Sequence, residues 1–250
     1  MLEFRSIAGG YARHNIIEDI SLTLPDGQLT VIIGPNGSGK STLLKLGAGL
    51  LVPSQGAVYA DGANLQELSP QNIAQKIAFM PQSRPLPDMT VETLVMHGRF
   101  PWLAYPRVYR AKDIYRAETA MQQAGIIGKR GQMLAKISGG ERQKAYLAMA
   151  LAQDTPHILL DEPSANLDIA VKMELEALLQ NLKAAGKCVA VVLHDLAAAL
   201  EMGDFVAVIK EGGLLATGTP AQILAAGAIE EAFNVRITRS EQIRFTQTIV

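Results

Sequence analysis

One segment combines three glycines, a lysine and a serine in a spacing suited to holding phosphate. Residues 34–41 read Gly-Pro-Asn-Gly-Ser-Gly-Lys-Ser and fit the pattern G-x-x-x-x-G-K-[ST] in full. Glycine lets the backbone wrap closely round a phosphate with its N–H groups pointing inward. Lys40 can neutralise the β- and γ-phosphates of ATP, and the Ser41 hydroxyl can bind Mg²⁺. The candidate phosphate-binding residues are Gly34, Pro35, Asn36, Gly37, Ser38, Gly39, Lys40, Ser41 and Thr42.

A second segment ends an apolar run in two carboxylates. His157–Leu160 is followed by Asp161, Glu162 and Pro163. Successive side chains of a strand point to opposite faces, so the two acids can have different tasks. Asp161 suits Mg²⁺ binding, directly or through water, and Glu162 suits a general base that polarises an attacking water. Taken alone, such residues are usually a solvated acidic strand end, and the chemical interpretation depends on the glycine-rich segment 34–41 earlier in the chain, which fits the P-loop pattern.

A second glycine-containing turn opens another expected helix. The turn lies at the start of the helical run 140–153 and consists of Ser138, Gly139, Gly140 and Glu141. A helix N-terminus carries free N–H groups and a partial positive charge, so it can bind phosphate. By itself a Ser-Gly-Gly turn is most often a helix cap. One nucleotide does not need two such cradles from one chain, so the pair predicts two copies closing head to tail on shared ATP.

These residues need a framework that brings them together, and the hydrophobic pattern supplies one. The expected strands are Leu2–Ile7, Ile16–Leu24, Leu29–Ile33, Ala57–Ala60, Ile77–Met80, His157–Leu160, Cys188–Leu193, Phe205–Lys210 and Gly213–Ala216. The expected helices are Ser41–Leu51, Val91–His97, Ala111–Gln123, Gly140–Gln153, Ile169–Ala185, Leu196–Met202 and one that begins at Pro220–Ala226. Alternating strands and helices predict a mostly parallel sheet covered on both faces. Residues 85–153 form an expected helical subdomain inserted into a core of 1–84 and 154–250; the tail beyond Gly227 has no clear pattern.

Composition limits the other classes of protein. The chain has 250 residues, 48% hydrophobic and 19% charged, with a net charge of −1, so nucleic acid is not an expected partner. We expect no signal peptide, because the first residues show no basic region followed by an apolar one. We also expect no membrane-spanning helix, because acids and His194 interrupt the apolar stretch 188–209. Cys188 is expected to be a small buried residue. His14, His97 and His157 are expected at the surface or in the core, since none has metal-ligand spacing with a cysteine.

Over residues 1–240 the chain resembles the nucleotide-binding subunits of ABC transporters. Gly34–Ser41 resembles their Walker A motif, Ile158–Glu162 their Walker B motif and Ser138–Glu141 their signature motif, with Ile137 where leucine is more usual. The resemblance implies an α/β P-loop NTPase (ABC ATPase) core with a mostly parallel sheet, an N-terminal antiparallel β part and an inserted helical subdomain. It also implies that ATP and Mg²⁺ are the cofactors.

Four further assignments follow from the resemblance alone. Tyr11 matches an aromatic residue that stacks on adenine, and Gln82 matches the Q-loop glutamine that contacts Mg²⁺ or water. Asp168, in the D-loop Ser164–Asp168, works across the dimer, and His194 matches the switch histidine that contacts the γ-phosphate. Without the resemblance, Tyr11 would be interpreted as a surface tyrosine and His194 as a structural histidine.

The segment Met89–Val95 together with His97–Pro101 resembles the importer subfamily for iron–siderophore complexes, haem and vitamin B12. The alternative is simply the amphipathic first helix of the subdomain. The apolar residues between the prolines suit a groove for a short helix of a membrane partner: Phe100, Trp102, Leu103 and Tyr105. The implied function couples ATP-driven closure of a homodimer to uptake through separate integral membrane permease subunits. The resemblance also implies that a substrate-binding protein takes part indirectly and that the chain lies at the cytoplasmic face of the inner membrane.

Two other functions are open at this stage. A non-transport ATPase of the same superfamily, acting on nucleic acid or ribosomes, usually carries a long coiled coil or two cassettes. Here the interval from Lys40 to Ser138 holds only a compact subdomain, and the sequence has no second P-loop. The near-neutral charge also disfavours nucleic acid. An exporter subunit is the third alternative. The cargo is not encoded in this chain, because the substrate does not contact it.

Overall fold

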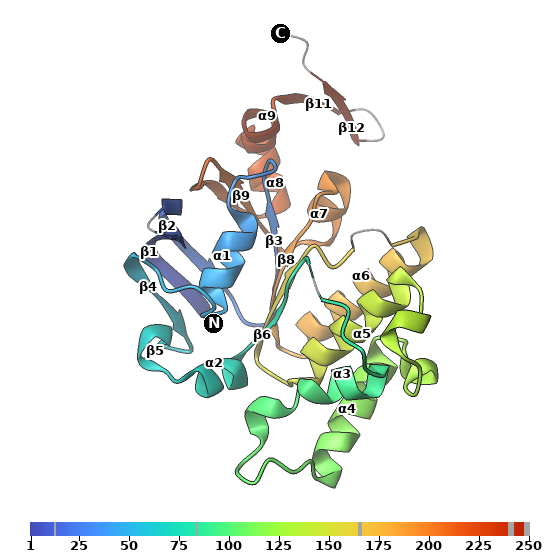
Figure 1. Cartoon of the computed structure of the whole chain (residues 1–250). Helices are drawn as coiled ribbons and strands as arrows, with labels where there is room; N and C mark the ends of the chain where they lie inside the picture. The colour runs from blue at the N-terminus through green and yellow to red at the C-terminus, as the bar shows by residue number, and fades with distance from the viewer. Residues whose placement is uncertain (13, 84, 165–166, 240–242, 248–250) are drawn as a thin grey trace.

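Two β-sheets pack on opposite sides of helix α1 (Lys40–Gly47) in the computed structural model (Figure 1). The structure describes residues 1–12, 14–83, 85–164, 167–239 and 243–247. The larger sheet has the order β10 (Gly213–Gly218), β9 (Phe205–Lys210), β3 (Leu29–Ile33), β8 (Cys188–Val192), β7 (His157–Asp161), β6 (Ile77–Met80). It is parallel from β9 to β6, and β10 is antiparallel to β9. The smaller, antiparallel sheet has the order β2 (His14–Leu24), β1 (Leu2–Tyr11), β4 (Gln55–Ala60), β5 (Ala63–Asn64).

The other helices contact the larger sheet or pack against one another. They are α2 (Pro70–Lys76), α3 (Val91–His97), α4 (Ala111–Gln123), α5 (Gly139–Ala152), α6 (Ile169–Ala184), α7 (Leu196–Met202), α8 (Pro220–Ala225) and α9 (Ala228–Phe233). A hairpin of β11 (Val235–Arg239) and β12 (Ile243–Gln247) follows α9. Among the described residues, no helix has both the length and the apolar character needed to span a bilayer. The predicted fold class, a mostly parallel sheet with an antiparallel N-terminal part, is confirmed.

Most predicted elements agree with the structure to within a few residues, and the differences have local causes. Helix α1 ends at Gly47 instead of Leu51. Gly49 adopts a left-handed φ of 67°, and the Leu50 N–H donates to the Lys45 carbonyl at 2.9 Å, which closes the helix end. Helix α2 was not predicted, although Ser69 caps it and Pro70 begins it. Helix α9 and the hairpin after it were not predicted either.

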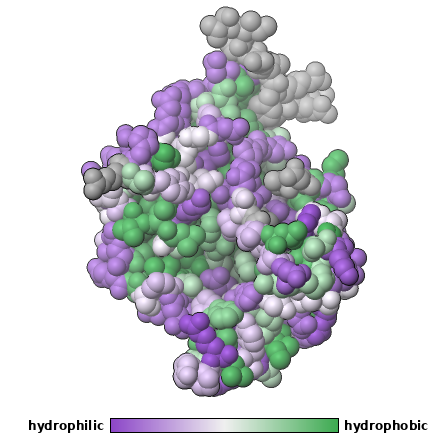
Figure 2. All heavy atoms as spheres, viewed as in Figure 1, coloured by the Kyte–Doolittle hydropathy of each residue, from purple (hydrophilic) through white to green (hydrophobic). Residues whose placement is uncertain are grey.

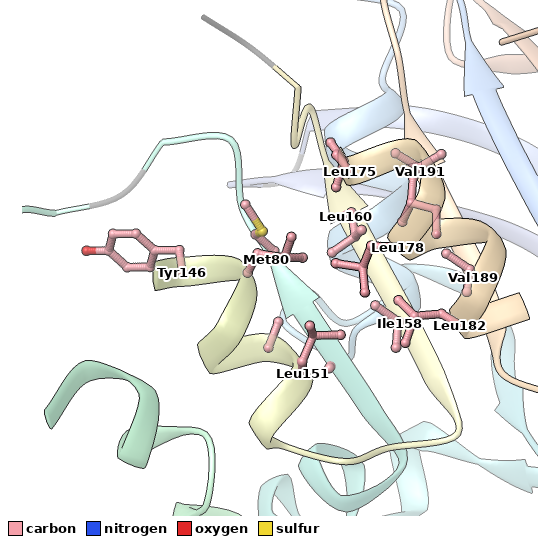
Figure 3. Close-up of a cluster of buried hydrophobic side chains, with 14 of the residues drawn as sticks. Met80, Tyr146, Leu151, Ile158, Leu160, Leu175, Leu178, Leu182, Val189 and Val191 are labelled. Carbon is pink, nitrogen blue, oxygen red and sulfur yellow. The ribbon is translucent and has the colours of Figure 1, made fainter. Parts of the chain in front are cut away.

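The helical segment joins the larger sheet through a continuous apolar cluster. In this cluster, Leu151 of α5 lies with Ile158 and Leu160 of β7 (Figure 3). Leu178 of α6 belongs to the same cluster. Helices α3, α4 and α5 also pack against one another. The burial of these apolar side chains holds α5 against β7, the strand that ends at Asp161. The division of the chain at 85 and 153 into a subdomain and a core stays a prediction.

Part of the segment predicted as a partner-binding groove is instead buried structure. Arg99 is 6% exposed and Leu103 is 6% exposed, so the prediction of an exposed groove is wrong for Leu103. Arg99 Nε donates to Asp113 Oδ1 at 3.2 Å, and its Nη1 donates to the Ala152 carbonyl at 2.7 Å. The arginine therefore caps the C-terminus of α5 and pairs with a carboxylate of α4. This explains an Arg at position 99 without any partner protein.

The next residues of the segment connect it to the core. The Pro101 carbonyl accepts hydrogen bonds from Gln71 Nε2 at 2.9 Å and Gln75 Nε2 at 2.7 Å, both on α2. The Trp102 indole donates to the Gln153 carbonyl at 2.7 Å. Residues 99–102 thus form a hydrogen-bonded connection between α2 and the C-terminus of α5.

We expect Arg99→Met to lower the free energy of unfolding by about 3–5 kcal/mol, because it leaves the Asp113 carboxylate, 1% exposed, without its charge partner. Urea denaturation followed by circular dichroism would measure the loss. Arg130→Met is the matched control, since the ion pairs of Arg130 with Glu92 and Glu118 lie at the surface and contribute about 1 kcal/mol or less. Equal losses in the two variants would contradict the structural role of Arg99.

Candidate active site

The glycine-rich loop connects the carboxyl end of β3 to the N-terminus of α1. Gly34 has no space for a side chain, because a Cβ there would lie 2.1 Å from the Ile209 carbonyl oxygen. Gly39, just before α1, has a left-handed φ of 102°, and its Cβ would lie 2.6 Å from Ile17 Cδ1. Gly34 is therefore required by the approach of the Ile209 carbonyl, and Gly39 by its left-handed backbone. The close approach of this loop to a phosphate stays a prediction.

The loop contains a buried cation and a buried hydroxyl. Lys40 is 6% exposed, and its Nζ donates to the carbonyls of Gly34 and Pro35, both at 2.8 Å. Burial lowers the pKa of Lys40. Ser38 Oγ is buried without a hydrogen-bond partner among the described residues. A phosphate would give the ammonium an opposite charge and the hydroxyl a partner, so these residues fit an anionic ligand.

Asp161 and Ser41 meet beside this loop. Asp161 is the last residue of β7 and is 1% exposed, and it accepts a hydrogen bond from Ser41 Oγ at 3.1 Å. Burial raises the pKa of Asp161, and the neighbouring Glu162 carboxylate raises it further. A carboxylate and a hydroxyl oxygen at one point are a donor set that Mg²⁺ accepts. A divalent cation there would also relieve the cost of burying the carboxylate.

Glu162 lies outside β7, so its direction does not come from strand alternation as predicted. Its φ of 50° is in the left-handed region, which non-glycine residues rarely adopt and which is often found at functional sites. Gln82 Nε2 donates to Glu162 Oε2 at 2.6 Å, and His194 Nε2 lies 2.5 Å from Oε1. A backbone turn and two side chains therefore fix the orientation of this carboxylate.

The sheet order explains why these three residues converge. Gln82 follows β6 and His194 follows β8, and these strands flank β7, which leads into Glu162. Because the strands are parallel, their carboxyl ends open on the same edge of the sheet as the P-loop. Residues far apart in sequence thus form one site around the start of α1.

Tyr11 lies at the end of β1 and contacts α1. Its hydroxyl accepts a hydrogen bond from Lys45 Nζ at 2.9 Å, and the Lys45 ammonium lies 5.4 Å from the ring centroid. The ring is 45% exposed. The structure therefore brings Tyr11 to the same helix as Lys40 and Ser41, with part of its ring accessible.

Ser138 and Glu141 form a capping box at the start of α5. Ser138 Oγ accepts from the Glu141 N–H at 3.2 Å, and the Glu141 carboxylate accepts from the Ser138 N–H at 2.8 Å, which lowers the pKa of Glu141. Lys129 Nζ lies 3.2 Å from Glu141. Ser138 and Gly139 are exposed, and Gly140 is half-buried. In Figure 1, α1 and α5 lie on opposite sides of the view. Among the described residues, the side-chain hydrogen bonds and the ion pair of Ser138 and Glu141 are to each other and to Lys129, and none reaches the loop 34–41.

Asp168 begins α6 and is also engaged within its own copy. Its Oδ1 accepts from the Val171 N–H at 2.9 Å, and the residue is exposed. Two positions of the predicted D-loop, 165 and 166, lie outside the described residues.

One connection between the turn 138–141 and the acidic end of β7 was not predicted from the sequence. Gln143 of α5 donates through Nε2 to the Pro163 carbonyl and lies 3.5 Å from the Glu162 carbonyl. It joins the helix of the signature turn to the backbone that positions Glu162. A glutamine two residues after Glu141 carries no pattern of its own, so only proximity in the fold could identify it.

A strand–glycine loop–helix unit with a buried lysine, a Ser–Asp pair and an oriented glutamate defines a P-loop nucleoside triphosphatase. Comparison with known proteins narrows this class. Residues 17–165 match the family model described as ABC transporter, and the chain belongs to this family.

The similarity to known proteins extends over nearly the whole chain. The ferric enterobactin transport ATP-binding protein FepC of Escherichia coli (strain K12) is 38% identical over 91% of this chain and 84% of its own length. The hemin import ATP-binding protein HmuV of Nocardia farcinica (strain IFM 10152) is 35% identical over 90% and 78%. The dimeric post-hydrolysis structure of the cassette MJ0796 with ADP and Pi has a TM-score of 0.78 at 26% identity, covering 88% of this chain and 99% of that one. The chain is thus a nucleotide-binding cassette with ATPase activity.

Proposed function

We propose that this chain is the ATP-hydrolysing subunit of an importer that takes up iron–siderophore complexes or haem through separate membrane subunits. The observation that carries the proposal is the similarity over about nine-tenths of the chain to subunits named for such uptake. These include FepC, HmuV and the iron(3+)-hydroxamate import ATP-binding protein FhuC of Bacillus subtilis (strain 168), the last at 34% identity.

In the nucleotide site, Lys40 and the loop before it hold the phosphates of ATP. Mg²⁺ is bound by Ser41, Asp161 and Gln82, and Tyr11 stacks on adenine. Support comes from the buried Lys40 ammonium, the 3.1 Å Ser41–Asp161 contact and the accessible Tyr11 ring. Glu162 is the general base for water, and His194 contacts the γ-phosphate; the 2.5 Å contact between these two supports their joint action.

Two copies complete each other's sites in this proposal. Ser138–Glu141 and Asp168 of one copy face the P-loop of the other, and the exposed start of α5 supports this. The γ-phosphate and Mg²⁺ then make contacts that exist only in the closed pair, so ATP favours closure and hydrolysis favours opening. Residues 85–153 act as the helical subdomain that transmits this movement.

The membrane partner binds beside the segment between the 3₁₀ helix Phe100–Trp102 and α4. Tyr105 is 97% exposed there, and Phe100 and Trp102 are each 38% exposed. In Figure 2 the lower end, where this segment lies in Figure 1, is mostly pale purple to white with small hydrophobic areas. Exposed aromatic residues of this kind are typical of interfaces. The chain would then reside on the cytoplasmic face of the inner membrane, with a substrate-binding protein acting through the permease.

We expect Tyr105→Glu to reduce co-purification of a polytopic membrane protein by at least about 10-fold, because it puts a charge into an apolar contact. The measurement is affinity purification of the full chain from detergent-solubilised membranes, with ATP binding checked in parallel. Val52→Glu is the matched control, since Val52 is 75% exposed on the antiparallel side of the molecule. If the unaltered chain brings down no polytopic membrane protein, the importer proposal fails.

A further inference from the structure

Three potential metal ligands meet at the amino edge of the larger sheet, the end opposite the nucleotide site. His157 is the first residue of β7 and Cys188 the first of β8, and the two are paired in the parallel register. Paired residues of adjacent strands point to the same face, so their side chains are neighbours. Asp26, in the turn between β2 and β3, adds a carboxylate. One ligand atom from each of the three residues lies within 4.8 Å of the others.

The hydrogen bonds of His157 leave one ring nitrogen available. The side chain is fully buried, and its Nε2 lies 2.9 Å from Asp61 Oδ1. Because a carboxylate only accepts, Nε2 carries the proton and Nδ1 keeps its lone pair. Nδ1 has no hydrogen-bond partner among the described residues and lies 3.9 Å from Asp26 Oδ1. A histidine that donates one N–H to a carboxylate and offers the other nitrogen is the usual metal-binding arrangement.

The carboxylates at this position already have cationic partners in the absence of an ion. A Cys188 thiolate would add a further negative charge beside the Asp26 carboxylate. The remaining acid, Asp61, is already paired with Lys76 at 3.2 Å and with the Met1 ammonium at 3.1 Å, and the ammonium also contacts Asp26.

Without an ion, the Cys188 thiol keeps its proton and the Asp26 carboxylate contacts the Met1 ammonium. Burial raises the pKa of the Cys188 thiol to about 12, and the thiol donates to the Leu24 carbonyl at 3.4 Å. A bound ion would displace the thiol proton to solvent, as metals do with coordinating thiols. The Asp26 side chain is 57% exposed, which gives an entry path and freedom to move toward the ion.

We propose that Asp26, His157 and Cys188 bind one divalent ion that accepts sulfur, nitrogen and oxygen ligands, Zn²⁺ or a close chemical analogue, with water in the fourth position. Sulfur and imidazole ligands favour Zn²⁺ over Mg²⁺ or Ca²⁺. The ion would tie the β2–β3 turn to the first residues of β7 and β8. This site shares no residue with the nucleotide site, so it stands whether or not the importer proposal holds.

Titration of the full chain with Co²⁺ tests the proposal, because cobalt bound to a thiolate has charge-transfer absorption in the near ultraviolet. The chain has a single cysteine, so this band reports on Cys188 alone. We expect a band that saturates at about one equivalent. Asp26→Asn should weaken Co²⁺ binding by about 10-fold or more, and Cys188→Ser should abolish the band. His14→Asn, at an exposed histidine of β2, should match the unaltered chain.

Thermal unfolding with Zn²⁺ gives a second readout. We expect Zn²⁺ to raise the Tm of the unaltered chain by about 5 °C at saturating concentration, and to raise that of Asp26→Asn much less at the same concentration. Asp26 is exposed, so this variant keeps the test valid even if Cys188→Ser fails to fold. Cobalt binding without the thiolate band would mean an ion at the nucleotide site only and would overturn the proposal. An Asp26→Asn affinity equal to that of the unaltered chain would overturn it as well.

Discussion

Replacing Glu162 with glutamine is expected to lower the kcat of ATP hydrolysis by about 10²–10⁴-fold, with ATP affinity nearly unchanged. Glutamine keeps the size of the side chain and can still bond to its neighbours, but it cannot take a proton from water. The Glu162 side chain is 11% exposed and lies between Gln82 and His194. A base dissolved in the buffer therefore cannot easily reach this position and take over its role.

Phosphate release measures kcat, and equilibrium binding of a fluorescent ATP analogue measures affinity. With Mg²⁺ and ATP, the variant should also accumulate as a dimer in light scattering, because the step that reopens the pair is blocked. Glu18→Gln, at an exposed glutamate of β2, is the matched control. Unchanged hydrolysis in Glu162→Gln would remove this residue from the role of base.

Placing arginine at Ser138 is expected to reduce hydrolysis by at least about 100-fold while each chain still binds ATP. The bulky side chain would block the exposed start of α5, where the proposal places the phosphate of a nucleotide held by the other copy. Ser69→Arg provides a matched control, because Ser69 is also a serine N-cap, on α2, whose hydroxyl accepts from the Asn72 N–H at 3.2 Å. Both variants lose a cap, which costs about 1 kcal/mol, but only Ser138→Arg should lose activity.

Mixing two inactive variants tests whether the sites are shared between copies. A dimer of Ser138→Arg with Lys40→Ala contains one site with an intact P-loop and an intact signature turn. Hydrolysis should therefore reappear in the mixture and be absent from either variant alone. A mixture as inactive as its components would show that Ser138 does not act across a dimer.

The sequence by itself determined the parts of this protein whose requirements are local. A close carbonyl at Gly34 and a left-handed φ at Gly39 demand glycine, and an apolar run followed by acids marks β7 and Asp161. Helices α3 and α4 were predicted with their observed bounds, and in the structure Thr90 and Asp113 supply capping bonds within a few residues. Such signals depend on neighbours along the chain, and they can be read without knowledge of the fold.

Only the tertiary structure decided which distant residues meet. Strand order places Gln82 and His194 on either side of Glu162, and a left-handed turn, which strand alternation did not predict, directs its carboxylate. The same order pairs His157 with Cys188, although their spacing in the sequence suggested no metal site. Local patterns specify strands but not their neighbours, because the order of a parallel sheet is set by the packing of the whole chain.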